Sequence, residues 1–338
     1  MSPEKFTKKP LPLEEQLELL RQRGLVVLDE SLALRCLAHH NYYRLSVYRI
    51  PFSVPEKPDR FKPGTTFNDL WSLYDFDRSL CALVTEATKQ IEISARSQWA
   101  YRLAHAYGPM AYENQDVFHD NTHHQKCLAE LDKALKQSHE AFVAHHKKKY
   151  GMEHLPIWAA CEVMSFGTLS RFYHNIRRNG DRKCIAGQYR LSAAVFSSVL
   201  HHMVYVRNIC AHHARLWNRQ FTITLTIPHN PDVLAQSVVR SVHQTRCIYN
   251  TLVLLAYLMD IIDPCNTWGQ RIRQLIQQQK FPVVSHMGFP NDWHQLPIWK
   301  KSHNIDIQKL DGTRIEPPQG LDAHSSTPSG DILPAIPT

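Results

Sequence analysis

Apolar and polar residues alternate along most of the chain with the period of an α-helix. The clearest stretch runs from Phe67 to Tyr107, where neither Gly nor Pro occurs and apolar residues recur at steps of three and four. Such steps place the apolar side chains on one face of a helix. A straight helix of this length would span on the order of 60 Å, so we expect a bend or break near its middle.

The same period predicts several shorter helices, and capping residues, Gly or Pro mark some of their ends. We expect them at residues 13–23, 29–40, 156–178, 192–217, 231–262 and 267–279, with a further helix that ends in the basic run 145–150. Only FTITLTI (221–227) has the composition of a strand. Since the repeated strands of an α/β protein are missing, the predicted class is all-α, a helical bundle.

Composition divides the chain into three parts. A Pro-rich connector (55–66) separates an N-terminal helical extension, residues 1–60, from a main helical domain, residues 61–300. From about Ser302 onward the chain is rich in Pro, Ser, Gly and Asp, and such a segment buries too little surface to offset chain entropy. Residues 301–338 are therefore predicted to form a disordered tail.

The charge balance favours a polyanionic partner. The chain has 338 residues, 21% of them charged, and a formal net charge of +8 with 21 His in addition. This surplus suits nucleic acid, because Lys and Arg that neutralise phosphates release counterions. Many basic proteins nevertheless bind no polyanion, so the charge alone does not decide.

Other features favour a cytoplasmic protein without a metal or disulfide framework. The eight Cys form no CxxC pair. The N-terminus has no apolar signal core. The most apolar segment, 248–262, is short and interrupted by Asn250 and Asp260, so it is predicted to be a buried helix and not a membrane span.

The candidate chemistry lies in YVRNICAHHARLWN, residues 205–218. On the predicted helix, Asn208 and His212 are four residues apart and share a face, and Arg215 follows three residues later on that face. Arg207 lies at the edge of this stripe. The segment therefore places an imidazole between two guanidinium groups.

These groups suffice for cleaving RNA without a metal. An imidazole with a pKa of about 6.5 takes or gives a proton at neutral pH, and a guanidinium binds phosphate oxygens and stabilises the charge that grows on them. The nucleophile can be the 2′-hydroxyl of the RNA itself. The alternative is an ordinary solvated helix face, whose Arg, Asn and His serve as caps and ion-pair partners.

A metal site is the third interpretation, since His201, His202, His212 and His213 lie in this helix. Adjacent His side chains diverge, and His213 points to the flank opposite Arg207. His201 and His212 are eleven residues, about 16 Å, apart along the axis. One zinc ion cannot reach both, so we expect no zinc site here.

The segment RNICAHHARLWN (207–218) resembles the signature of the Abi-like abortive-infection family of bacteria, of the AbiD/AbiF type. That family is similar to the HEPN superfamily of ribonucleases, whose hallmark is an Arg, a polar residue, several spacers and a His. Arg207, Asn208 and His212 match the hallmark. Six further blocks follow the order of the family: residues 11–25, 41–52, 61–80, 91–109, 155–173 and 287–299.

The resemblance implies a HEPN-type helical bundle and metal-independent endonuclease action on RNA, with no cofactor. Arg207 would grip the scissile phosphate, His212 would transfer the proton and Asn208 would orient one of them, with His213 and Arg215 in support. It also implies a toxin-like role in defence against phage and a homodimer in which two motifs face each other. A small structured RNA is a further expected partner, as guide or inhibitor.

Two interpretations without catalysis remain open. A non-catalytic RNA-binding defence protein, which binds a small structured RNA, would show salt-dependent RNA affinity and no cleavage. A helical protein with no role in RNA would show neither.

Four charged residues outside the segment are candidates for supporting roles. Glu92 and Arg96 are four apart on one helix, which is typical of an ion pair worth roughly a few tenths of a kcal/mol. Alternatively, Glu92 orients the catalytic Arg or His from a neighbouring helix. Asp77 and Arg78 allow the same two interpretations.

RNA-binding surfaces are expected at two places. Tyr42, Tyr43 and Arg44 could stack on unpaired bases, although we expect core packing for at least one of the two Tyr. The basic residues of two later segments could follow the phosphate backbone or could simply be solvated. These residues are Lys147, Lys148, Lys149, Arg177 and Arg178, with Arg182 and Lys183 beside the last two.

Overall fold

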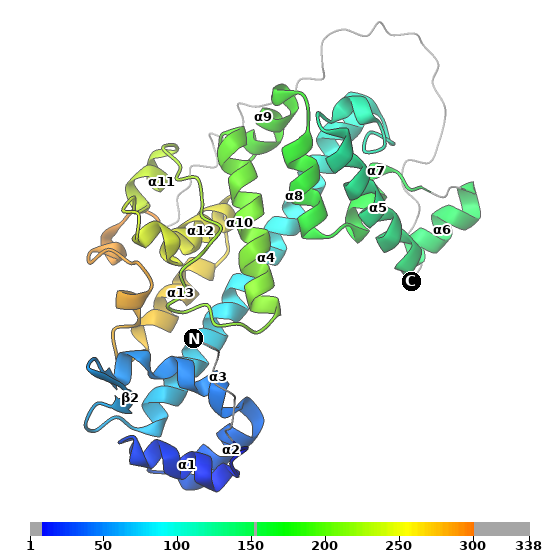
Figure 1. Ribbon diagram of the computed structural model, residues 1–338. Coiled ribbons are helices and arrows are strands. Elements are labelled where there is room, and N and C mark those ends of the chain that lie inside the picture. Colours follow the sequence, from blue (N-terminus) through cyan, green and yellow to red (C-terminus); the bar gives the residue numbers. More distant parts are fainter. Residues whose placement is uncertain (1–8, 152–153, 301–338) are drawn as a thin grey trace, which may run out of the picture. The chain divides into compact units, whose positions relative to one another are not determined.

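The computed structural model describes residues 9–151 and 154–300. α-Helices make up nearly all of its regular structure, and the only sheet in this part of the chain is an antiparallel hairpin of β1 (Ser53–Val54) and β2 (Lys57–Phe61) (Figure 1). The all-α prediction is confirmed. The expected disordered tail, residues 301–338, lies outside the described residues.

The described part of the chain contains thirteen α-helices. In chain order they are α1 (Leu13–Gln22), α2 (Glu30–His40), α3 (Tyr42–Ser46), α4 (Phe67–Tyr107), α5 (Asn121–Gln137), α6 (Ala141–Tyr150), α7 (Ile157–Val163), α8 (Phe166–Asn175), α9 (Asn179–Gly187), α10 (Ala193–Ala211), α11 (Asp232–Ser237), α12 (Tyr249–Ile262) and α13 (Trp268–Gln277). Short 3-10 turns lie between or after them: η1 (Val47–Phe52), η2 (Gln115–Val117), η3 (Gln244–Arg246), η4 (Val283–His286) and η5 (Trp293–Gln295).

The longest element is α4, a single helix of 41 residues. It begins with a capping box, in which the side chains of Thr66 and Asp69 each accept a hydrogen bond from the other residue's backbone N–H. It stops at Gly108, whose φ of 87° favours glycine. The prediction of a bend or break near its middle is wrong. Because α7, α8, α9, α10, α12 and α13 all pack against α4, its apolar side chains are buried along an uninterrupted helix.

Two other predicted helices are divided in the structure. Residues 156–178 form α7 and α8, because Ser165 Oγ accepts a hydrogen bond from Thr168 N (3.1 Å) and caps a new helix. Residues 231–262 hold the short α11 and then α12, with η3 between them. The predictions at 13–23 and 29–40, in contrast, are confirmed by α1 and α2.

The expected strand at 221–227 is also wrong. The segment is irregular, and its N–H groups find partners outside any sheet. Phe221 N donates to Arg246 O (2.7 Å), and Thr226 N donates to Ser198 Oγ (2.8 Å). Strand-forming residues without a neighbouring strand form no ladder, which is why composition misleads here.

Helix α12 lies inside the bundle. Every residue from Tyr249 to Asp260 is buried, which confirms the buried-helix prediction for 248–262. None of the described helices combines the length and apolarity that a membrane crossing requires.

Candidate active site

The candidate motif lies where α10 ends. His213 adopts a left-handed conformation with φ 54°. Its N–H donates to Cys210 O (2.9 Å), and Ala214 N–H donates to Ile209 O (3.0 Å). These two bonds form a Schellman motif, which terminates a helix. The prediction that this helix continues to Trp217 is therefore wrong, because it stops at Ala211.

Arg207, Asn208 and His212 lie together at this helix end. Val206 and Ile209 face the core, whereas Asn208 and His212 are exposed, one turn apart, with His212 N–H donating to Asn208 O (3.0 Å). Arg207 is half-buried, and its Nε is buried without a hydrogen-bond partner among the described residues. An unsatisfied buried N–H costs about 1–3 kcal/mol, so a bound acceptor at this Nε would be stabilising.

The loop after the motif is anchored by a buried carboxylate of α4. Asp77, 2% exposed, accepts hydrogen bonds from Trp217 N (2.6 Å), Leu216 N (3.2 Å) and Tyr48 Oη (2.7 Å). Burial raises the pKa of Asp77, and these donors oppose the rise. Asp77 therefore holds the backbone of the loop. The orienting role that the sequence left open would require a bond to Arg207 or His212, and among the described residues Asp77 makes neither.

Two arginines join the same loop to the N-terminal part of the chain. Arg215 donates to Val47 O and to Asn218 O (both 3.2 Å). It lies beyond the helix end, so the expectation that it shares a helix face with the motif is wrong. Arg44 of α3 donates to His213 O (2.7 Å). The expected base-stacking arginine therefore lies next to the candidate motif.

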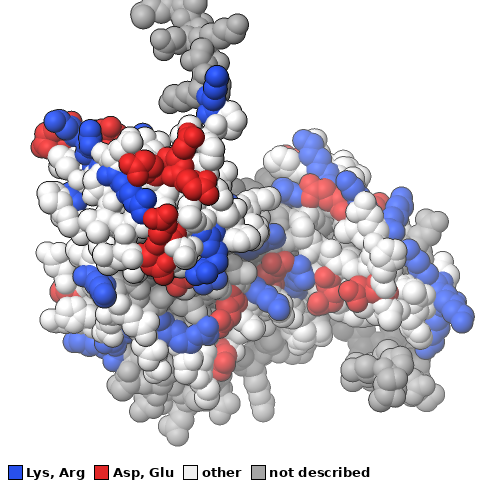
Figure 2. All heavy atoms as spheres, turned by 90° about the horizontal axis from the view of Figure 1, so that it is seen from below, with Lys and Arg blue, Asp and Glu red and all other residues white. Residues whose placement is uncertain are grey.

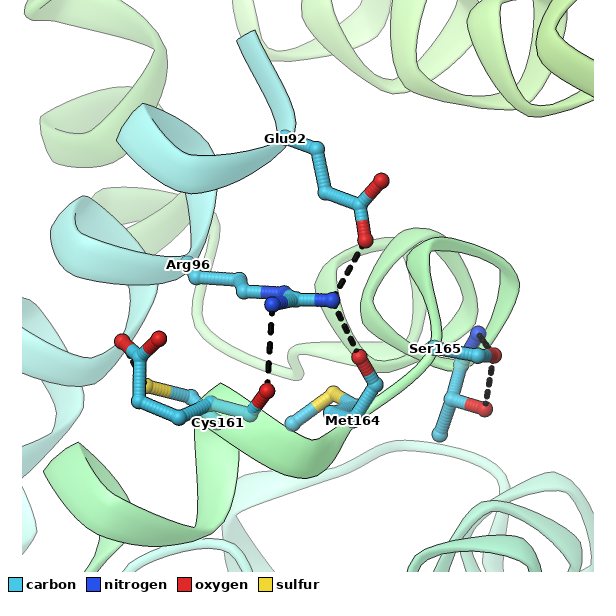
Figure 3. Close-up of polar contacts among 7 residues, drawn as sticks. Glu92, Arg96, Cys161, Met164 and Ser165 are labelled. Atoms are coloured by element: carbon cyan, nitrogen blue, oxygen red, sulfur yellow. Dashed lines mark hydrogen bonds and ion pairs between the residues drawn. The ribbon is translucent and has the colours of Figure 1, made fainter. Parts of the chain in front are cut away.

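Glu92 and Arg96 occupy another part of α4 (Figure 3). Arg96 donates to the Glu92 carboxylate, to Met164 O (2.5 Å) and to Glu162 O (3.2 Å). The two side chains are only 16% and 17% exposed. They tie α4 to the junction of α7 and α8, and among the described residues neither bonds the candidate motif. The contacts favour the ion-pair interpretation over an orienting role for Glu92.

A family model described as Abi-like protein matches residues 35–218. The chain belongs to the Abi-like family. No curated protein and no solved structure matches it. Four of the six resembling blocks lie inside the matched range, whereas 11–25 and 287–299 lie outside. All the contacts described above around the end of α10 fall within the range that this Abi-like chain shares with its family.

The remaining RNA-binding candidates of the Abi-like chain are spread over several elements. Tyr42 packs against the core, which confirms the expectation for one of the two Tyr, whereas Tyr43 is 73% exposed. Arg177 donates two hydrogen bonds to Phe118 O (3.0 and 2.8 Å) and so holds a loop. The other exposed candidates are Lys147, Lys148, Lys149 and Arg178. On the face drawn in Figure 2, Lys and Arg form separate groups with Asp and Glu between them.

His202 belongs to the packing of α10. Its Nδ1 lies 2.7 Å from Ile223 O and its Nε2 lies 2.8 Å from Thr251 Oγ1. Burial lowers its pKa from 6.5 to about 4. His201 beside it is exposed. Among the residues that the structure describes, no three His, Cys, Asp or Glu side chains are grouped so that they could hold a metal ion.

Proposed function

We propose that this Abi-like protein is a metal-independent RNA endonuclease, a toxin-like effector of bacterial anti-phage abortive infection. The observation that carries the proposal is the end of α10, where exposed Asn208 and His212 stand beside a half-buried Arg207 that no other described group holds. Membership of the Abi-like family supports the defence role. The likeness of Arg-Asn-x3-His to the HEPN hallmark supports the reaction.

In the proposed reaction His212 removes the proton of a ribose 2′-hydroxyl, and that oxygen attacks the adjacent phosphorus. The bond from phosphorus to the 5′ oxygen breaks, which leaves a 2′,3′-cyclic phosphate on one fragment and a 5′-hydroxyl on the other. Arg207 binds the phosphate oxygens and stabilises their growing charge. Asn208, one turn before His212, orients the imidazole or the phosphate.

The leaving oxygen also needs a proton. In an in-line displacement the attacking and leaving oxygens lie on opposite sides of phosphorus, so a single imidazole does not reach both. We therefore include a homodimer in the proposal, in which a second copy contributes its own motif from the other side. The proposal also keeps a small structured RNA as guide or inhibitor.

The test is incubation of the purified protein with mixed cellular RNA in EDTA, followed by mapping of fragment ends. We expect cyclic phosphate ends from the parent, and a loss of rate of about 10²-fold or more in Arg207→Ala and in His212→Ala. His201→Ala is the matched control, because it removes an exposed His from the same helix. Cleavage by His212→Ala at the parent rate would contradict the mechanism.

The same samples test the non-catalytic alternative, which the exposed Tyr43 and the exposed Lys147–Lys149 run support. That alternative predicts RNA binding that weakens steeply with salt, without cleavage by any variant. It also predicts that His212→Ala binds RNA as tightly as the parent.

A further inference from the structure

A cleft of about 660 Å³ adjoins the end of α10. The end of α10 contributes Cys210, Ala211 and His213 to the lining of this cleft. Cys210 and Ala211 come three and four residues after Arg207, so they lie one turn further along the same side of the helix. His212 stands between two lining residues. The cleft therefore begins where the candidate motif ends.

One wall of the cleft is aromatic and fixed in place. The Tyr74 ring contacts His40 and Tyr48 edge-on, with ring centroids 5.2 and 5.5 Å apart. Tyr48 is held in turn by its hydrogen bond to Asp77 (2.7 Å). A fixed aromatic ring can stack on an unpaired base at little cost in ordering.

Two thiols, Cys81 of α4 and Cys210 of α10, also line the cleft. Two causes raise the pKa of Cys81: first its contact with Cys210, and second its burial. The Cys81 thiol is therefore uncharged at neutral pH. Uncharged, polarizable groups suit a flat heterocycle better than they suit an ion.

Arg44 and Arg78 supply the positive charge at the cleft, and both are exposed. Arg44 uses one amino group on His213 O (2.7 Å), and Arg78 pairs with Asp75 of its own helix (2.6 Å). Each guanidinium has five N–H donors, so each keeps donors for phosphate oxygens. Asp77 also lines the cleft, but its carboxylate already accepts hydrogen bonds from Tyr48, Leu216 and Trp217. An aromatic wall, two thiols and two guanidinium groups together match a nucleotide.

We infer that this cleft binds one unpaired nucleotide of the RNA, next to the bond that is cut. The inference rests on the proposed function and adds a base-binding subsite to it. The base lies against Tyr74, its phosphates lie near Arg44 and Arg78, and the RNA continues to the motif. The substrate is therefore single-stranded RNA or an unpaired loop, because a base must leave the stack to enter such a pocket.

The test fills the cleft without changing the motif. Ala82→Trp introduces a large side chain at an exposed, cleft-lining position of α4. Ser72→Trp, at an exposed position of α4 that does not line the cleft, is the matched control. Arg78→Ala is a second variant that removes a charge and adds no bulk. Circular dichroism and urea unfolding show that each variant is folded.

Two readouts are compared among these proteins. Binding of the four nucleoside 3′-monophosphates is measured by titration calorimetry, and RNA fragment ends are sequenced after cleavage. We expect Ala82→Trp to weaken mononucleotide binding and to raise KM for single-stranded RNA by about tenfold each, the equivalent of one lost stacking contact. Its kcat should change little, and its base preference beside the cut should flatten. Ser72→Trp should behave like the parent.

The outcomes separate the subsite from the reaction. The inference is overturned if the parent binds no mononucleotide, or if Ala82→Trp and Arg78→Ala bind it as the parent does. Cleavage with an unchanged base preference in Ala82→Trp also overturns the subsite, although the proposed reaction stands. If Ala82→Trp abolishes mononucleotide binding, the subsite is supported even when no RNA is cut. Absence of cleavage by the parent then counts against the proposed reaction alone.

Discussion

Asp77 and Arg96 belong to the same helix, α4, about 28 Å apart along its axis, and they support two different regions. Asp77 accepts hydrogen bonds from backbone N–H groups after α10, and Arg96 donates to backbone carbonyl groups at the end of α7. In both places a charged side chain binds backbone groups: Asp77 binds N–H groups of the loop that follows α10, and Arg96 binds carbonyl groups that the end of α7 leaves without helical partners. The two regions differ in the polar side chains that lie beside these helix ends.

At the end of α10, polar groups remain available. Asn208 and His212 are exposed, and no described group holds Arg207. At the end of α7, Ser165 caps α8, and Arg96 pairs with Glu92 and donates to two carbonyl groups, although its Nε, like that of Arg207, is buried without a hydrogen-bond partner among the described residues. A buried charge is therefore not by itself a sign of an active site, and what distinguishes the end of α10 is the exposed Asn208 and His212.

Among these variants, substitution of Asp77 should lower the free energy of unfolding most. Asp77→Ala leaves two backbone N–H groups and the Tyr48 hydroxyl without their acceptor, each at about 1–3 kcal/mol, so the free energy of unfolding should fall by about 3 kcal/mol or more. RNA cleavage should fall as well, because the loop after the motif loses its anchor. Urea unfolding and cleavage rates measure both.

Asp75→Ala is the matched control for that change. Asp75 pairs with Arg78 at 47% exposure, and exposed ion pairs contribute about 0–1 kcal/mol. If Asp77→Ala were as stable as Asp75→Ala, Asp77 would not be the anchor of the loop.

His202 is a third buried polar side chain, and unlike Asp77 and Arg96 it can be tested by measuring stability against pH. Burial lowers the pKa of His202 from 6.5 to about 4, so the unfolded chain binds more protons than the folded chain between these values. The free energy of unfolding should therefore decrease as pH falls from 6.5 to about 4, by about 3 kcal/mol in total. His202→Gln should lose this slope and His201→Gln should keep it. Equal slopes in the two variants would show that His202 titrates normally.

The smallest expected effect is at Arg96. Arg96→Met leaves Glu92 and two carbonyl groups without their donor, so the free energy of unfolding should fall by about 1–3 kcal/mol. The double variant with Glu92→Gln should recover part of this loss. RNA cleavage should be unchanged in both, which separates this region from the motif. A large fall in cleavage by folded Arg96→Met would instead restore the orienting role considered for Glu92.

The helical pattern of the sequence predicted most elements but not all of their ends. Apolar residues at steps of three and four located α1, α2, α4 and α13. The end of α10 was missed because its left-handed residue is His213, where Gly is usual. The start of α8 was available in principle, since Ser165 is a preferred capping residue.

The candidate residues followed from residue type, whereas their supports did not. Arg44 and His213 are 169 positions apart in the sequence, and Asp77 and Trp217 are 140 apart. Spacing along the chain carries no information on such pairs. They depend on how α3 and α4 pack near the end of α10, which only the fold shows.

The uninterrupted course of α4 limits how this chain can vary in length. Each residue added to a helix turns everything beyond it by about 100° and moves it by about 1.5 Å. A single insertion between Asp77 and Arg96 would therefore turn one of them away from the helix end that it supports. Loops accept extra residues far more easily. We expect relatives of this chain to preserve the spacing of these two positions and to gain or lose residues elsewhere.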